Sequence, residues 1–91
     1  MKSDVDKLLN NHRDLVHSEG VKVVSHTQRE DADWILHTLM LEGIDVPFKF
    51  KRQKKYKSLK GAKVNLTYYP AIETVAGFEI EVMKVVRVKL Y

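Results

Sequence analysis

The stretch TQREDADWILHTLMLEG, residues 27–43, decides the predicted fold, because it carries the clearest secondary-structure signals in the chain. Thr27 followed three residues later by Glu30 forms a capping box, in which each side chain bonds a free amide of the first helical turn. Apolar residues then recur at the three- and four-residue spacing of one helix face: Ala32, Ile35, Leu36, Leu39 and Met40. Gly43 stands where a helix commonly ends in the left-handed conformation. The sequence therefore predicts a helix over 28–42.

On the N-terminal side, the segment 3–19 also predicts an amphipathic helix. Its apolar positions share one helix face, together with one histidine: Val5, Leu8, Leu9, His12 and Val16. Ser3 and Asp6 form a variant of the capping box, and Gly20 lies at the position of a C-terminal cap. The β-branched segment 21–25 between the two helices predicts a short strand.

On the C-terminal side, the period of the apolar residues changes to two, which is typical of strands. Phe48 and Phe50 alternate with lysines, and a second alternating run has these apolar positions: Ala62, Val64, Leu66 and Tyr68. Residues 58–61 and 76–77 read as turns. Because Pro70 interrupts the second run, residues 71–75 are predicted as either a loop or a short extra strand.

The last run, residues 78–90, alternates over the greatest length. Its predicted apolar face is Phe78, Ile80, Val82, Val86, Val88 and Leu90. A strand of this length spans about 43 Å, whereas the radius of gyration expected of a small domain is about 12 Å. We therefore expect the strand to bend, to break near Met83-Lys84, or to project into a partner.

These elements predict an α+β fold. Two N-terminal helices with a short strand between them precede an antiparallel, three- to four-stranded bent sheet or small barrel, which packs on helix 28–42. The 91 residues form a single domain. Within it, we expect residues 21–91 to form a compact α+β core. The N-terminal helix, residues 1–20, can be loosely attached to this core.

Composition and motifs exclude most kinds of active site. Without cysteine there is no disulfide and no thiol nucleophile. The histidines lack metal-ligand spacing, and the best pairing is Asp33 with His37, four residues apart on the predicted helix. Glu79 and Glu81 could form a carboxylate pair, but strand lysines facing them would explain both as ion pairs. We expect no enzyme, no metal and no cofactor. The absence of a signal peptide and of a long apolar segment predicts a cytoplasmic protein that does not enter membranes.

Charge divides the chain into two parts. Residues 1–46 have five basic and nine acidic residues, a net charge of −4, and residues 47–91 have eleven basic and three acidic residues, a net charge of +8. Most of the excess lies in one acid-free tract with aromatic residues in and after it. The predicted nucleic-acid-binding residues are Lys49, Lys51, Arg52, Lys54, Lys55, Tyr56, Lys57, Lys60, Lys63, Tyr68 and Tyr69.

This pattern favours a non-enzymatic module that binds single-stranded RNA or DNA, because lysines neutralise phosphates and aromatic rings stack on unpaired bases. The alternative is protein–protein interaction or homodimerisation through the long strand 78–90 and the charge division. Lysines also protect the edges of sheets, and the acidic half could neutralise the basic half within one chain. Phe48 and Phe50 fit the core better than a stacking surface.

Three known families share single features with the chain. The tract 52–56 ahead of a barrel-like run is similar to the entry of cyclic-dinucleotide-binding PilZ barrels, which also need a second arginine and a D/N-x-S-x-x-G motif that this chain lacks. The short strands are similar to an OB-fold, but OB-folds place their helix between the third and fourth strands. The predicted order is closer to an Sm-like layout, without an Sm motif. No family is therefore assigned.

Overall fold

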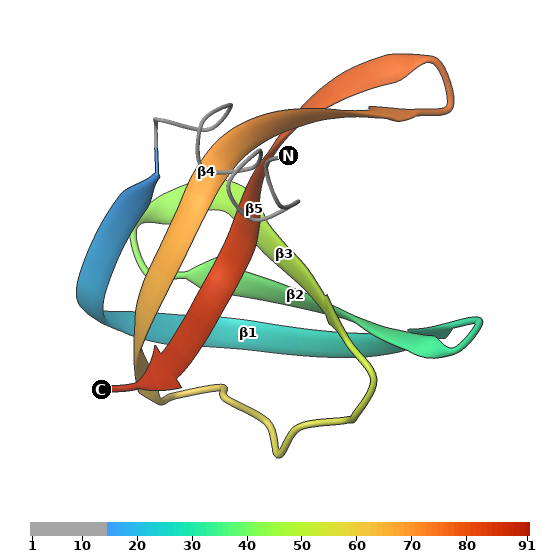
Figure 1. Cartoon of the computed structure of the whole chain (residues 1–91). Coiled ribbons are helices and arrows are strands. Elements are labelled where there is room, and N and C mark those ends of the chain that lie inside the picture. The colour runs from blue at the N-terminus through green and yellow to red at the C-terminus, as the bar shows by residue number, and fades with distance from the viewer. Residues whose placement is uncertain (1–14) are drawn as a thin grey trace, which may run out of the picture.

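The computed structural model describes residues 15–91, and this part of the chain is all-β. Its five strands are β1 (Val16–Asp31), β2 (Trp34–Leu41), β3 (Ile44–Arg52), β4 (Lys63–Val75) and β5 (Phe78–Leu90). They close into a barrel in the order β1-β2-β3-β5-β4 (Figure 1). The predicted α+β class is therefore wrong, because residues 15–91 contain no helix.

The barrel is closed by the pairing of β1 with β4 and by the pairing of β3 with β5. The long β1 pairs with β4 through its first half and with β2 through its second half, both antiparallel. β3 and β5 run parallel and pair at only two positions, Phe48 with Met83 and Lys49 with Lys84. Residues 53–62 connect β3 to β4 without regular secondary structure.

The segment predicted as helix 28–42 is a β-hairpin. It contains the end of β1, a turn at Ala32-Asp33 and the whole of β2. The run WILHTLML is apolar on both sides, so it satisfies the helical period as well as the period of two. In β2 the inward residues are Ile35, His37, Leu39 and Leu41. Eight residues between two turn signals are a typical strand length, and this length outweighs the capping motif.

The N-terminal prediction fails where it can be compared. Residues 3–14 of the predicted helix 3–19 lie outside the described residues, but 16–19 belong to β1. Gly20 is not a helix cap. It has φ +65° at an irregularity of β1, and a Cβ atom there would lie 3.3 Å from the Tyr91 ring. The predicted strand 21–25 is part of β1 as well, so the expected boundary between 20 and 21 falls inside a strand.

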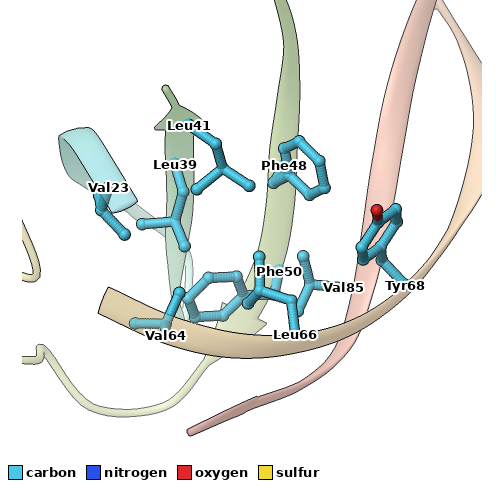
Figure 2. Packing of buried hydrophobic residues seen from close by; sticks show 9 residues of the cluster. All are labelled: Val23, Leu39, Leu41, Phe48, Phe50, Val64, Leu66, Tyr68 and Val85. Atoms are coloured by element: carbon cyan, nitrogen blue, oxygen red, sulfur yellow. The ribbon is translucent and has the colours of Figure 1, made fainter. Parts of the chain in front are cut away.

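The predicted strands after residue 46 agree much better with the structure. Phe48 and Phe50 are buried, and they join the core that fills the barrel (Figure 2). The core cluster is Val23, Leu39, Leu41, Phe48, Phe50, Val64, Leu66, Tyr68 and Val85. The turn within 58–61 is confirmed by a hydrogen bond from the Ala62 amide to the Leu59 carbonyl. Residues 71–75 are strand, and the following turn has positive φ at both Ala76 and Gly77, as in a type I′ hairpin.

β5 bends later than predicted. In the β4–β5 pairing, Thr67 lies opposite Arg87 and Tyr68 opposite Val85, so Val86 is an extra residue. Val85 and, after the bulge, Val88 both face the core, so the predicted even-numbered apolar face is not continuous. Val82 is also buried, but it lies on the opposite face of the strand from Val85. Beyond the barrel, the end of β4 and the start of β5 project as a hairpin (Figure 1). Residues 71–80 are called the arm below.

Candidate nucleic-acid interface

The structure divides the predicted basic tract between two surfaces. Lys49 and Lys51 point outward from β3, because Phe48 and Phe50 between and beside them point into the core. After Arg52 the chain leaves the sheet. Residues 53–62, called the basic loop below, bond to inward-facing side chains of β1 and β2. The loop lysines and the strand lysines therefore lie on opposite sides of the β1–β2–β3 sheet.

Gln28 of β1 holds the middle of the basic loop. Its Nε2 donates to the Tyr56 carbonyl at 2.7 Å, and its Oε1 accepts from the Tyr56 amide at 2.8 Å. Both backbone groups of one loop residue are thus satisfied by one side chain. A loop that forms no ladder of its own needs such partners, since unpaired backbone groups are costly to bury.

Two histidines hold the loop on either side of Tyr56. The Leu59 amide donates to Nδ1 of His26 at 2.9 Å, so the proton of this ring is on Nε2. His26 Nε2 then donates to His37 Nδ1 at 2.9 Å, and His37 Nε2 donates to the Lys54 carbonyl at 3.3 Å. The direction of each bond follows from the one before it, because a backbone amide starts the chain and a carbonyl ends it. Both rings are therefore neutral.

The surroundings of these rings keep them neutral. Burial lowers the pKa of His26, and the nearby His37 lowers it further. Burial also lowers the pKa of His37, which is completely enclosed; the bond to the Lys54 carbonyl opposes this change, and the charge of Arg52 adds to it. The His37 ring is stacked on Phe50 with centroids 4.7 Å apart. A charge placed here would be poorly solvated.

The predicted tyrosines have three different environments. Tyr56 packs against His37 with ring centroids 4.6 Å apart, so it helps to fix the loop. Tyr68 lies in the core, packs edge-on against Phe48 and shares a hydrogen bond with Ser18. Tyr69 is half-buried on the outside of β4 and borders a surface hollow. Of the three rings, that of Tyr69 is the one best placed to meet a ligand.

The loop lysines are mostly free of acidic partners. Lys55 lies 3.7 Å from Glu30, in an exposed pair of small energetic weight. Within residues 15–91, no ion pair involves the other predicted cations of this surface, Lys54, Lys57, Lys60 and Lys63. Arg52 lies over the Phe50 ring at 5.1 Å and bonds the Lys51 carbonyl.

On the other side of the sheet, the strand register assembles a second basic surface, called the outer face below. Leu36 of β2 lies between Arg29 of β1 and Lys51 of β3. Two adjoining hollows of about 390 and 190 Å³ share Leu36 and Lys49 in their lining. Together they form a shallow trough, which runs from Arg29 across β2 and β3 to Lys84 on β5.

Three residues of this face were missed by the sequence reasoning. Arg29 and Lys84 lie outside the basic tract and reach the trough only through strand pairing. Trp34, the only tryptophan of the chain, is 43% exposed at the start of β2. It points to the same side as Leu36, because residues two apart share a strand face. The predicted helix hid the shared side of Trp34 and Leu36, which a period of two would have shown.

The outer face is partly neutralised by the chain itself. Lys49 Nζ donates to Glu73 Oε1 at 2.8 Å, and Lys84 Nζ lies 3.9 Å from Glu73 Oε2. Lys51 lies 3.9 Å from Asp31. The expectation of ion pairing between the two halves of the sequence thus holds for Asp31 and for Glu30, described above.

The candidates for other chemistry are not assembled. No cluster of three metal-ligating residues occurs in the described part of the chain. Asp33 and His37 are separated by about 13 Å along an extended chain, so the pairing expected from a helix is wrong. Glu79 and Glu81 of β5 lie opposite Thr74 and Ile72 of β4, and not opposite the lysines expected to face them. Residues 15–91 contain no helix with the length and apolar character required to cross a membrane.

Comparisons with known proteins give no assignment: no family model, no curated protein and no solved structure matches the chain.

Proposed function

We propose that the chain is a non-enzymatic module that binds single-stranded RNA or DNA on its outer face. The observation that supports this most directly is the trough, in which cations surround an apolar floor at Leu36. Tyr69 lines the hollow that contains Lys84, and Trp34 points to the same side of β2 as Leu36. Cations along a groove neutralise phosphates, and aromatic side chains stack on unpaired bases without requiring a particular sequence.

The strand order supports the proposal by analogy. A five-stranded barrel in the order β1-β2-β3-β5-β4, with β3 and β5 parallel, has the topology of an OB-fold. OB-folds bind oligonucleotides on the face of strands 2 and 3, between the β1–β2 and β4–β5 loops. The helix that argued against this resemblance in the sequence is a hairpin, and the basic loop occupies the place of the usual OB-fold helix.

The outer face suits the ligand better than the loop surface does. The one aromatic ring of the basic loop, Tyr56, is packed against His37. The loop therefore offers positive charge without a free stacking ring. We assign its lysines, and Lys63 beside them, the role of attracting a polyanion over longer distances.

Trp34 provides the test, because its fluorescence reports directly on the proposed surface. We expect single-stranded oligonucleotides to quench its emission at about 50 mM salt, and the affinity to fall steeply at about 200 mM. Replacing Trp34 by Phe removes the signal, so a labelled oligonucleotide followed by anisotropy measures the same affinity independently. Absence of binding at low salt by both readouts would refute the proposal.

A matched pair of variants distinguishes the two surfaces. Lys51→Glu and Lys57→Glu change the net charge equally, one on the outer face and the other on the basic loop. We expect Lys51→Glu to weaken binding several-fold more than Lys57→Glu. Equal losses would assign the interaction to general electrostatic attraction instead of to the trough.

A second candidate function, protein association or homodimerisation, is supported by the arm. Its apolar side chains are unusually exposed: Ile72 57%, Val75 49%, Phe78 72% and Ile80 40%. Val75, Phe78 and Ile80 share one face of the arm, and contiguous exposed apolar surface commonly marks an interface. Sedimentation equilibrium at high micromolar concentration tests self-association, and Phe78→Ser should abolish it. A monomer at all concentrations would leave only association with a different protein.

A further inference from the structure

Glu73 has an unusual position at the base of the arm. Its carboxylate is bonded to Lys49 of β3 at 2.8 Å and lies 3.9 Å from the ammonium group of Lys84 of β5. Lys51 of β3 adds a third positive charge nearby. The lysines are thus supplied by strands of the barrel, whereas the carboxylate is supplied by the projecting hairpin.

The charges around this carboxylate are not balanced. Three lysines face Glu73 and the exposed Asp31, which lies 3.9 Å from Lys51, so one positive charge remains in excess at a hollow of about 190 Å³. The hydrogen bond from Lys49 lowers the pKa of Glu73 most, burial opposes it, and the charges of Lys49, Lys84 and Lys51 lower it further. Glu73 is therefore ionised at neutral pH, and the hollow still favours additional negative charge.

A nucleic-acid phosphate resembles this carboxylate in the features that lysines recognise. A phosphodiester also carries a single negative charge and exposes two oxygens that can accept hydrogen bonds from ammonium groups. A carboxylate held among three lysines therefore occupies the position that such a phosphate would take.

We propose that Lys49, Lys51 and Lys84 form a phosphate-binding subsite, and that Glu73 occupies it in the free protein as a competitor from the same chain. This inference rests on the proposed function and deepens it. A bound phosphate displaces the Glu73 carboxylate and takes over its contacts with Lys49 and Lys84. Glu73 thereby weakens the binding of polyanions that engage the subsite.

Displacement also changes how the arm is held. Among the described residues, the bond between Lys49 and Glu73 is the one side-chain hydrogen bond made by residues 71–80. When a phosphate replaces Glu73, the arm keeps its β4–β5 ladder but loses this tie to β3. Ligand binding at the subsite is therefore coupled to release of the arm.

A matched pair of variants tests the competition. Glu73→Gln and Glu81→Gln each remove one negative charge from the β4–β5 hairpin, but Glu81 makes no ion pair with any described residue. We expect Glu73→Gln to bind a single-stranded oligonucleotide about 3- to 10-fold more tightly than Glu81→Gln at about 50 mM salt. Both variants gain some affinity because each loses one negative charge, and the difference between them measures the additional effect of freeing the subsite. Equal affinities of the two variants, with binding by the unmodified chain intact, would overturn the subsite and leave the proposed function standing.

Inorganic phosphate separates the subsite from nucleic-acid binding. In ¹⁵N-edited NMR titrations, we expect phosphate to shift the amides of residues 49, 51 and 84 in Glu73→Gln at concentrations that leave Glu81→Gln unchanged. If no oligonucleotide binds any variant but these shifts occur, the proposed function fails and the subsite is one for free phosphate. If phosphate shifts neither variant at these amides, the subsite is refuted even where oligonucleotides bind. Circular dichroism of both variants verifies that the barrel is intact.

Discussion

The basic loop and the arm are both ten residues long, and they differ in how they are held. Residues 53–62 have no regular hydrogen bonding, yet Gln28, His26 and His37 fix their backbone from positions inside the barrel. The arm has a complete antiparallel ladder but projects from the barrel with its apolar side chains exposed. Regular secondary structure and firm attachment are therefore separate properties in this molecule.

The difference has an energetic basis. The hydrogen bonds of the loop lie against buried rings, where an unpaired donor or acceptor costs about 1–3 kcal/mol. A two-stranded ribbon without a second layer is at best marginally stable in water. We therefore expect the loop to open only when the barrel unfolds, and the arm to open locally and far more often.

The largest effect should come from removing the ring that anchors the loop. His37→Ala leaves a cavity and removes the partners of His26 and of the Lys54 carbonyl. We expect a loss of about 3–5 kcal/mol in the free energy of unfolding, measured in urea. Phe78→Ala on the arm is the matched truncation of an exposed ring, and we expect a change within about 0.5 kcal/mol. Similar losses of unfolding free energy in the two variants would contradict the proposed difference between the firmly held loop and the loosely held arm.

A smaller effect is expected on acidification, which leaves both histidine rings in place. Folding lowers the pKa of His26 and of His37 below the ordinary value of 6.5. Below that value the unfolded chain binds more protons than the folded chain, so stability is fully present above about pH 6.5 and falls as the pH is lowered. Folding also lowers the pKa of Glu73, so its contribution to stability is likewise lost on acidification, but only below its ordinary pKa of 4.5.

Urea unfolding between pH 7.5 and 5 measures the histidine contribution apart from that of Glu73. His26→Gln should reduce the pH dependence, because the amide can replace the bonds of His26 without titrating. Stability that rises between pH 7 and 5 would show that the two rings are not held neutral.

The smallest effect concerns the tip of the arm. Ala76 has φ +50° in a turn that favours Asn-Gly, so Ala76→Asn should relieve backbone strain. We expect slower hydrogen exchange of the arm amides, equivalent to about 0.5–1 kcal/mol, and no comparable change in global unfolding. A change in global stability as large as the local one would show that the arm and the barrel unfold together.

The sequence predicted those elements in which one side of a strand is apolar and the other is not. Phe48 and Phe50 alternate with lysines, so only one period fits; the sequence favoured the core for both without deciding it, and the structure buries both. Trp34 to Leu41 are apolar on both sides, so the helical period fitted equally well and the prediction failed. The bulge at Val86 also has no local signal, because it depends on pairing with β4.

The candidate interface was predicted in composition but not in arrangement. The basic tract is visible in the sequence, yet its division between the loop and the outer face follows from where β3 ends. Trp34, Arg29 and Lys84 join the outer face from three other strands, and only the strand register places them there. An interface assembled by pairing is therefore read from a sequence only after the strands have been identified correctly.

The short parallel pairing of β3 with β5 has a consequence for how binding could be detected. Because β3 and β5 pair at only two positions, this is the least extensive strand pairing of the barrel, and we expect it to open first. An oligonucleotide bound from Lys51 to Lys84 would contact both strands and stabilise their pairing. Binding should then raise the melting temperature and slow amide exchange along both strands, beyond the residues that the ligand touches.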